Sequence, residues 1–221
     1  MINKVAIVLN GPIDCFLTGS IRNYAFVIAV DGGLNHLVKY DMDADLFIGD
    51  YDSVNDEAKG YIETSNITHV DYNEDKDKTD FELALEYVSK KCEIKTVDIY
   101  CAMGGREDHT MTVLNNVLAY SKDLNITVYG GDQAVKVLNE GDEIKVVNRI
   151  DVTSFSMVPV DEEFTVSIKS AKWELDHETV SRASSLLMSN KAMGDHALIT
   201  AHKNRAFLFI TLFLSLIHIS E

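Results

Sequence analysis

Short hydrophobic runs alternate with longer amphipathic segments over the first 130 residues of the chain. The runs are rich in β-branched residues and cover 4–10, 24–30, 45–49, 67–72, 96–101 and 126–130. Helical spacing is clearest at 79–91 and 108–121, and in the first of these Phe81, Leu85 and Val88 repeat along one face. Strands that are apolar throughout and alternate with helices predict a mostly parallel α/β sheet covered on both faces.

The pattern changes after residue 133. From there the chain shows short strand-like runs with polar clusters between them and no long helical segment. The runs read VKVL, EIKVV, TSFSMV, FTVSIK, SSLLMS, HALIT and AFLFIT. Such a series is typical of an antiparallel β-sandwich. We therefore predict an α/β domain over residues 1–132, followed by an all-β sandwich domain over residues 133–221.

Composition narrows the class of protein. The 221 residues carry a net charge of −15, which argues against a nucleic-acid-binding surface because phosphate backbones are held by Lys and Arg. The three cysteines are dispersed without a CxxC pair, as expected of reduced thiols in the cytoplasm. The apolar tail AFLFITLFLSLIHI is shorter than the roughly 20 residues of a membrane-spanning helix. We expect a terminal strand through Thr211 and no membrane association, and we expect the residues after it to be dispensable.

Aspartates gather where the predicted parallel strands end. The segments that follow four of these strands contain Asp31-Gly32-Gly33, then Asp50 and Asp52, then Asp77 and Asp80, then Arg106, Asp108 and His109. Because the carboxyl ends of parallel strands share one edge of the sheet, these segments are expected to converge there.

Each segment also has an ordinary structural interpretation when it is taken alone. DGG is typical of a turn that uses glycine at positive φ, and GDYDS is either a turn or a metal loop. Thr79 is a suitable cap for the helix that follows it, and Asp108 is a favourable charge at the start of a helix. Crowding at one edge favours the functional interpretation, because a hard cation with oxygen ligands relieves the repulsion between carboxylates.

The cations near these aspartates suit a polyphosphate. Lys76, Lys78 and Arg106 lie in the same segments, and an Arg binds phosphate in a forked geometry. Gly104 and Gly105 precede the helix at 108–121 and would let a phosphate approach the N–H groups at its start. The residues therefore predict a magnesium-dependent nucleotide or phosphoryl-transfer site, and they leave the acceptor open.

The ordered motifs DGG, GDYDS, KDKTD and GGREDH resemble those of the thiamine pyrophosphokinase family over about the first 130 residues. In the second half, SFSMVPV, SAKWELD and LLMSNKAMGD resemble the family's β domain. Ser189 and Asn190 match the pair at which thiamine docks, but Lys191, Ala192 and Met193 stand where the family has an aromatic residue.

The resemblance implies pyrophosphoryl transfer from ATP to thiamine, with Mg²⁺ as the metal and a homodimer whose thiamine pocket lies between the α/β domain of one subunit and the β domain of the other. It assigns the metal to Asp50, Asp52 and Asp80. The expected ATP contacts are Asp31, Gly32, Gly33, Asp77, Lys78, Thr79, Arg106 and His109. The expected catalytic residues are Asp80, Arg106 and Asp108, the last orienting or deprotonating the hydroxyl, and the expected thiamine-binding residues are Ser189 and Asn190.

Two other functions remain open at this point. A phosphatase would use an aspartate of the DxD segment as its nucleophile, although GDYDS has no Thr after the second Asp. A non-catalytic nucleotide sensor would use the β domain to bind a partner. Trp173, the single tryptophan, is expected in the core of the β domain rather than as a stacking platform.

Overall fold

The computed structural model describes residues 2–13, 21–70, 77–148 and 152–212. The chain divides into two compact units, Met1–Gly131 and Asp132–Glu221, and each is described by itself. Within the described ranges no helix is both long and apolar enough to cross a bilayer. Lys76 and the tail from residue 213 onward, both considered above, lie outside the described residues.

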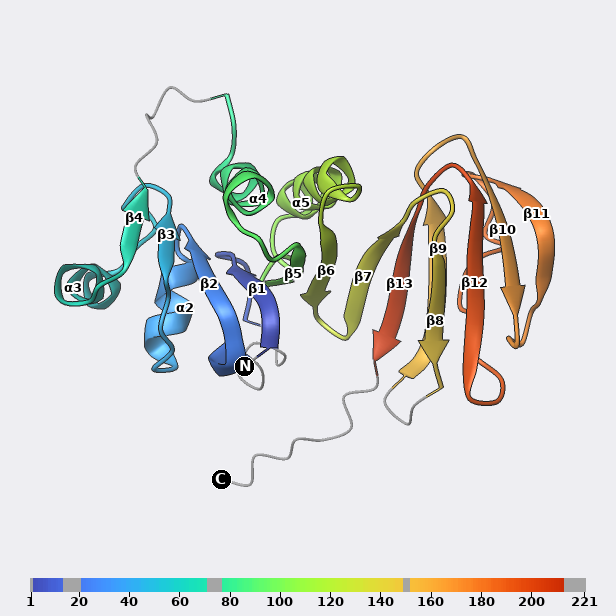
Figure 1. The fold of residues 1–221 in the computed structure, drawn as a ribbon, viewed down its shortest axis with the longest axis horizontal. Helices are drawn as coiled ribbons and strands as arrows, with labels where there is room; N and C mark the ends of the chain where they lie inside the picture. Colours follow the sequence, from blue (N-terminus) through green and yellow to red (C-terminus); the bar gives the residue numbers. More distant parts are fainter. Residues whose placement is uncertain (1, 14–20, 71–76, 149–151, 213–221) are drawn as a thin grey trace. The chain divides into compact units, whose positions relative to one another are not determined.

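The first unit is a parallel sheet between two layers of helices (Figure 1). Its strands are β1 (Ile2–Val8), β2 (Tyr24–Val30), β3 (Leu46–Ile48), β4 (Thr68–Val70), β5 (Thr96–Tyr100) and β6 (Asn125–Gly130). The order across the sheet is β4-β3-β2-β1-β5-β6, and every described pairing is parallel. The chain therefore reverses its winding direction at β1, between β2 and β5.

The helices of this unit cover both faces of the sheet. They are η1 (Ile21–Asn23), α2 (Gly33–Lys39), α3 (Asp56–Thr64), α4 (Asp80–Lys91) and α5 (Glu107–Tyr120). Leu34 and Leu37 of α2 and Ala58 of α3 join the core cluster on one face, while α4 and α5 pack together on the other (Figure 1). The central strands are mostly buried between these layers: β3 is buried throughout, and β2 and β5 are buried over their last four residues. This explains their apolar runs.

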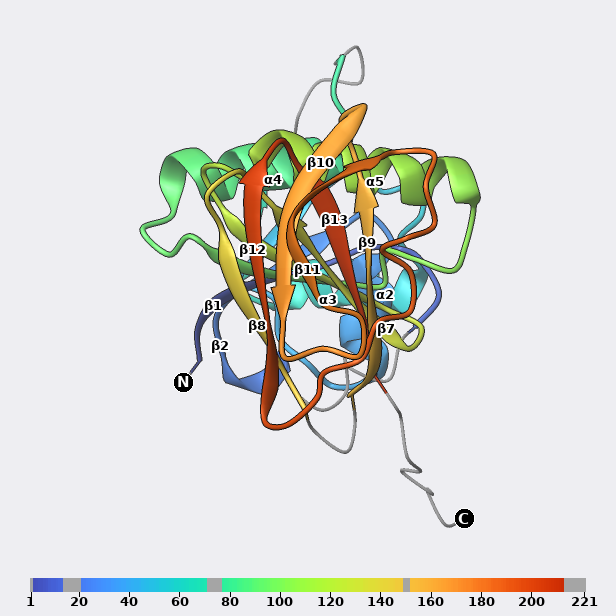
Figure 2. The same cartoon turned by 90° about the vertical axis from the view of Figure 1, so that its right-hand side faces the viewer.

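The second unit is a sandwich of two antiparallel sheets. Its strands are β7 (Gln133–Leu138), β8 (Glu143–Val147), β9 (Val152–Pro159), β10 (Glu163–Lys169), β11 (Leu175–Ser181), β12 (His196–Lys203) and β13 (Ala206–Leu212). One sheet has the order β7-β13-β9 and the other β11-β10-β12-β8, with the four-stranded sheet nearer the viewer in Figure 2. The fold class predicted from the sequence is confirmed.

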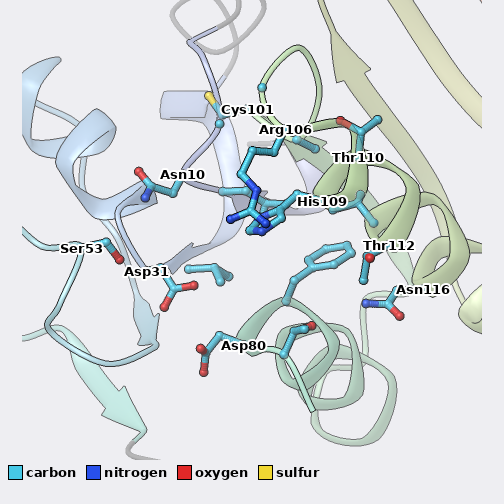
Figure 3. A pocket seen from close by; sticks show the side chains of 18 of the residues that line it. Asn10, Asp31, Ser53, Asp80, Cys101, Arg106, His109, Thr110, Thr112 and Asn116 are labelled. Carbon is cyan, nitrogen blue, oxygen red and sulfur yellow. The ribbon is translucent and has the colours of Figure 1, made fainter.

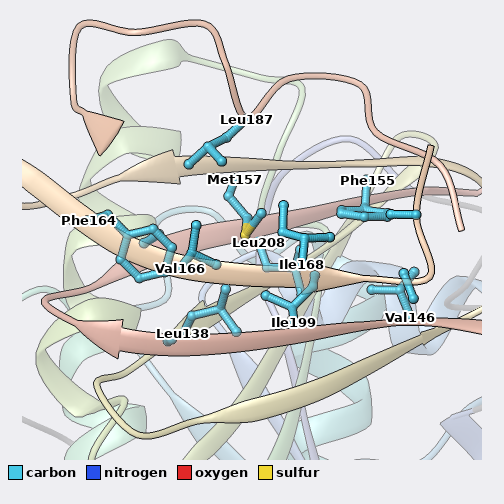
Figure 4. Close-up of a cluster of buried hydrophobic side chains, with 14 of the residues drawn as sticks. Leu138, Val146, Phe155, Met157, Phe164, Val166, Ile168, Leu187, Ile199 and Leu208 are labelled. Carbon is cyan, nitrogen blue, oxygen red and sulfur yellow. The ribbon is translucent and has the colours of Figure 1, made fainter. Parts of the chain in front are cut away.

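The core of the sandwich is built from residues at alternating positions. Phe164, Val166 and Ile168 of β10 point inward, as do Phe155 and Met157 of β9. All five are at most 1% exposed. Together with residues of the other strands they form the cluster shown in Figure 4. This alternation is the signal that made most of these strands recognisable in the sequence.

One sequence-based prediction in this unit was wrong, and one strand was not predicted. SSLLMS forms turns instead of a strand, because only Leu187 is buried while Leu186 and Met188 are 54% and 48% exposed. The strand that was not predicted is β11, in which Val180 is the single buried residue. An edge strand with mostly exposed polar side chains lacks the alternation on which the prediction depended.

Candidate active site at the carboxyl edge of the α/β unit

A cavity of about 630 Å³ lies where the winding of the parallel sheet reverses. The segments after β1 and β5 form part of its wall through Asn10, Gly11, Cys101 and Ala102, and Asp31 contributes from the end of β2 (Figure 3). Open α/β sheets bind ligands at this position, because neighbouring connections leave the sheet toward opposite faces there and open a crevice. The volume is that of a small-molecule site.

The glycines of the DGG motif permit close backbone packing. A Cβ on Gly33 would lie 2.1 Å from the Val8 carbonyl oxygen, and one on Gly32 would lie 2.2 Å from Asn10 Oδ1. The positive φ in this motif belongs to Asp31, at 50°, and not to either glycine. DGG is therefore more than a glycine turn, since it lets the start of α2 approach the end of β1 while Asp31 turns toward the cavity.

The loop with Asp50 and Asp52 is held by Asn35 of α2. Asn35 Nδ2 donates to the Ser53 carbonyl at 2.8 Å, and Asn35 Oδ1 accepts from the backbone N–H of Asn55 at 2.9 Å. Within the loop, the Asp52 N–H donates to Asp50 Oδ1 at 3.1 Å. Ser53 lines the cavity, whereas Asp50 and Asp52 are exposed and do not belong to its wall. Sequence analysis missed Asn35, because nothing in the motif marks it.

The start of α4 brings Asp80 to the cavity. Thr79 caps the helix, its side chain accepting from the Glu82 N–H, and both Thr79 and Asp80 line the wall. Lys78 does not, because its Nζ bonds Glu86 Oε2 at 2.6 Å and lies 3.6 Å from Glu82 Oε1. Asp77 is exposed and also lies outside the wall.

Arg106 and Asp108 form a forked ion pair at the start of α5. Arg106 Nη2 donates to Asp108 Oδ2 at 2.6 Å, and Arg106 Nε donates to Oδ1 at 3.1 Å. This pairing lowers the pKa of the Asp108 carboxyl to about 2. Arg106 and His109 line the cavity and Asp108 does not. A carboxylate with so low a pKa is a poor proton acceptor, so Asp108 is better suited to orient Arg106 than to deprotonate a substrate.

The carboxylates at this edge have the chemistry that Mg²⁺ prefers. A Cβ on Gly49 would lie 2.3 Å from Asp31 Oδ1, so this carboxylate packs against the backbone directly before Asp50. Asp31 and Asp80 line the same cavity (Figure 3). In the described part of the chain, no three His, Cys, Asp or Glu side chains are already arranged around a common metal position. Because Mg²⁺ keeps several waters and usually takes one or two protein carboxylates plus substrate phosphates, these residues fit it.

In the second unit, Asn190 fixes the backbone around Trp173. The buried Asn190 side chain donates to the Trp173 carbonyl at 2.7 Å and accepts from the Trp173 N–H at 3.1 Å. Trp173 itself is 50% exposed, with Lys172 Nζ 4.3 Å from its ring centroid. The prediction that Trp173 belongs to the core was wrong. The backbone of Trp173 is anchored by Asn190, whereas its ring is exposed to solvent. Ser189, directly before Asn190, is also exposed.

Comparison with known families identifies both units. Residues 18–129, about half of the chain, match the model described as the catalytic domain of thiamin pyrophosphokinase. Residues 143–204 match that family's vitamin B1 binding domain. The chain belongs to the thiamin pyrophosphokinase family. It is accordingly an enzyme of that family, as the resemblance of the motifs implied.

Alignments with other members of the thiamin pyrophosphokinase family cover most of this chain. The thiamine pyrophosphokinase of Bacillus subtilis (strain 168) is 26% identical over 195 residues, which cover 85% of this chain and 88% of the relative. The crystal structure of the Bacillus subtilis thiamine pyrophosphokinase has a TM-score of 0.85 at 20% identity, covering 94% of this chain and 98% of that one. The Geobacillus thermodenitrificans structure gives 0.84 at 21%, covering 96% and 99%. These structures support the fold.

The cavity brings together about half of the residues predicted for the catalytic end of this family member. Asp31, Thr79, Asp80, Arg106 and His109 all line it. Gly32, Gly33, Asp50, Asp52, Asp77, Lys78 and Asp108 lie outside its wall. The roles of both groups stay predictions. Asn10 and Asn116 also line the cavity. They were not among the predicted site residues, although Asn10-Gly11 and the Asn115-Asn116 pair fit the family's sequence pattern.

Proposed function

We propose that the protein transfers a pyrophosphoryl group from ATP to the primary hydroxyl of thiamine, giving thiamine diphosphate and AMP. The observation that carries this proposal is the cavity at the carboxyl edge, which is lined by the carboxylates of Asp31 and Asp80 together with the guanidinium of Arg106. The two units of the chain match the two domains of the family. Pyrophosphoryl transfer needs both charges, because carboxylates bind the phosphates through a divalent cation and a guanidinium contacts phosphate oxygens directly.

The reaction requires positioning more than covalent help from the protein. The hydroxyl oxygen of thiamine attacks the β-phosphorus of ATP, the bond to the oxygen bridging the α- and β-phosphorus breaks, AMP leaves, and the hydroxyl proton passes to solvent. Arg106 neutralises charge on the transferred group, and Asp108 keeps the Arg106 guanidinium oriented through their forked pair. Thr79, at the cap of α4, and His109, on α5, both line the cavity, and we assign them to contacts with ATP.

Asp50, Asp52 and Asp80 are the residues we assign to Mg²⁺, with Asp31 beside them. The bound metal would neutralise the phosphate oxygens and hold them for in-line displacement. Asn35 fixes the loop that carries Asp50 and Asp52. Lys78 reaches a phosphate only after it exchanges its pairing with Glu86, so we expect its contact to form when ATP binds.

We place the pyrimidine ring of thiamine against Trp173, with Ser189 as a polar contact. This aromatic ring is exposed, and Asn190 fixes its backbone, so Trp173 supplies the stacking surface that is missing after Asn190 in the sequence. Asn190 then acts on thiamine through Trp173 instead of by direct contact. Because Trp173 is the single tryptophan, thiamine should quench the intrinsic fluorescence of the protein, and it should not quench that of Trp173→Phe.

We also propose a homodimer with shared active sites, since the predicted ATP residues and the predicted thiamine residues belong to different units. Asp80→Ala and Ser189→Ala subunits are each expected to be inactive alone. When they are mixed and allowed to exchange, hybrid dimers should regain part of the activity. No recovery despite demonstrated subunit exchange would rule out sharing.

Product analysis tests the function itself. With ATP, thiamine and Mg²⁺, the protein should form AMP and thiamine diphosphate in equal amounts. Inorganic phosphate without AMP would indicate the phosphatase instead, and no product would indicate a nucleotide sensor. Asp52→Ala should abolish turnover with an unchanged circular dichroism spectrum, whereas Asp123→Ala, an exposed aspartate remote from the cavity wall, should leave turnover intact.

A further inference from the structure

The tyrosine between Asp50 and Asp52 is hydrogen-bonded to the neighbouring strand. The Tyr51 hydroxyl lies 2.9 Å from His69 Nδ1, although Tyr51 is 40% exposed. His69 belongs to β4, the outermost strand in the sheet order, which pairs with β3 (Figure 1). The hydrogen bond therefore joins the loop that follows β3 to the strand beside it.

His69 also contacts the residue directly before Asp50. Its Nε2 lies 3.5 Å from the Gly49 carbonyl oxygen, a longer and weaker contact than the one with Tyr51. Because a carbonyl oxygen only accepts hydrogen bonds, we assign a proton to Nε2, and Nδ1 is left to accept from the Tyr51 hydroxyl. One imidazole thus contacts the residues on both sides of Asp50.

Ring packing holds this imidazole in place. His69 lies opposite Phe47 in the pairing of β4 with β3, and the two ring centroids are 5.1 Å apart. The Tyr51 ring contacts both, edge-on to His69 at 5.1 Å and tilted against Phe47 at 5.8 Å. Phe47 is fully buried. The three rings therefore connect the loop with Asp50 and Asp52 to the core of the sheet.

The loop is thus held at both ends. Asn35 bonds its far end from α2, and His69 holds its start from β4. Asp50 and Asp52, between these two contacts, are exposed. In a loose loop the backbone would have to become ordered as a metal binds, and this loss of conformational entropy would oppose binding. A loop that is already ordered avoids the loss.

We propose that His69 is a positioning residue for the metal site. Through Tyr51 and Gly49 it keeps Asp50 ordered beside Asp52 before a divalent cation binds. The proposal rests on the proposed function, because it uses the assignment of the metal to these two aspartates. In this role His69 does not touch the cation. Its loss weakens metal binding and leaves the chemical step unchanged once metal saturates the site.

Three substitutions separate the hydrogen bond from the ring packing. His69→Phe keeps a ring against Phe47 and removes the acceptor, and Tyr51→Phe removes only the partner hydroxyl. Tyr61→Phe is the matched control. Its hydroxyl also holds a loop, accepting from the Ala44 N–H at 3.2 Å, but this loop precedes β3 and lies at the other end of that strand.

Metal affinity is measured directly on the full-length chain without nucleotide. Mn²⁺ replaces Mg²⁺ at oxygen sites and is observed by electron paramagnetic resonance, and Asp52→Ala identifies the signal of this site. His69→Phe and Tyr51→Phe should each raise the Kd of Mn²⁺ about 3- to 10-fold, the effect of one hydrogen bond. The double variant should bind about as weakly as the weaker single variant, because both changes remove the same contact. Tyr61→Phe should leave the Kd unchanged.

Activity adds a readout that damage to the fold would not reproduce. At low Mg²⁺ the His69→Phe protein should turn over more slowly than the wild type, and saturating Mg²⁺ should restore its kcat. A kcat that stays low at saturating Mg²⁺ would show a structural role and would overturn the proposal. An unchanged Kd of Mn²⁺ in His69→Phe, or effects of His69→Phe and Tyr51→Phe that add in full, would overturn it as well.

Failure of this proposal and failure of the proposed function give different results. A wild type that forms thiamine diphosphate and AMP, but whose affinity for Mn²⁺ does not change in His69→Phe, would refute the positioning role alone. A wild type whose affinity for Mn²⁺ depends on His69, but which forms no thiamine diphosphate, would refute the proposed function alone.

Discussion

Replacement of Gly33 by Ala should destabilise the α/β unit although Gly33 begins a helix. The added Cβ would lie 2.1 Å from the Val8 carbonyl oxygen and 2.7 Å from its carbon. Both atoms belong to the backbone of the segment that ends β1 in the middle of the sheet, so neither can move aside as a side chain would. The strain is purely steric, because Gly33 is not among the glycines with positive φ.

The two opposing effects can be compared. Overpacking against a rigid neighbour costs about 1–3 kcal/mol, and a contact this short with backbone belongs at the upper end. Ala instead of Gly in a helix returns about 1 kcal/mol. The net loss of roughly 2 kcal/mol in the free energy of unfolding corresponds to a fall in Tm of roughly 4–8 °C for a chain of this size.

Gly60→Ala is the matched control. Gly60 lies inside α3, and a Cβ there would meet nothing within 4 Å. The helix propensity then acts alone and should raise the Tm by roughly 2–4 °C. The two variants therefore differ in sign for the same chemical change. The Tm of both variants is measured by calorimetry. A Gly33→Ala protein with a Tm at or above that of the wild type would refute the steric explanation of the DGG motif.

Three further outcomes are expected. Asn35→Ala should raise the Mg²⁺ concentration that supports half-maximal activity several-fold, because the Asp50–Ser53 loop loses both bonds that hold it; an unchanged Mg²⁺ dependence would count against Asn35 as a positioning residue. Asp108 should titrate with a pKa of about 2 in a ¹³C NMR experiment, and Arg106→Ala should return this pKa toward about 3.9. The ion pair should thus favour the folded state above about pH 4 and be lost as the pH falls toward 2, and a Tm difference between wild type and Arg106→Ala that is independent of pH would contradict this. Asn190→Ala should lower the fluorescence anisotropy of Trp173, whose backbone it anchors, and the same anisotropy in both proteins would refute that role.

The helices with strong periodicity could be predicted from the sequence closely. The expected ranges 79–91 and 108–121 correspond to α4 at Asp80–Lys91 and α5 at Glu107–Tyr120. Thr79 is indeed the N-cap of α4. Each of these two helices buries one face against a sheet, so the pattern of burial and the local helix propensity both predict a helix. For β11 the sequence shows no alternation of apolar and polar residues, because most of its side chains are exposed.

The environment of single side chains could be predicted only where a motif marks it. Arg106 and His109 reach the cavity as their motif suggested. Lys78, from the same kind of segment, instead pairs with Glu86, about two turns along α4. Trp173 was expected in the core because large aromatics usually are buried. What exposes it is the contact between its backbone and Asn190, 17 positions later, and sequence spacing does not reveal such a contact.

The cavity owes its shape to two residues in an unfavourable backbone conformation. Asp31 directly follows β2 with φ 50° and Cys101 directly follows β5 with φ 55°, and both line the cavity. Asp adopts this region with some ease, whereas Cys does so at a cost of order 1–3 kcal/mol. Hydrogen bonds hold both turns in place: the Asp31 N–H donates to the Ile48 carbonyl at 3.0 Å, and the Gly11 N–H donates to the Cys101 carbonyl at 2.8 Å. The chain thus leaves neighbouring parts of the sheet abruptly, which keeps the backbone from filling the crevice and leaves room for a ligand.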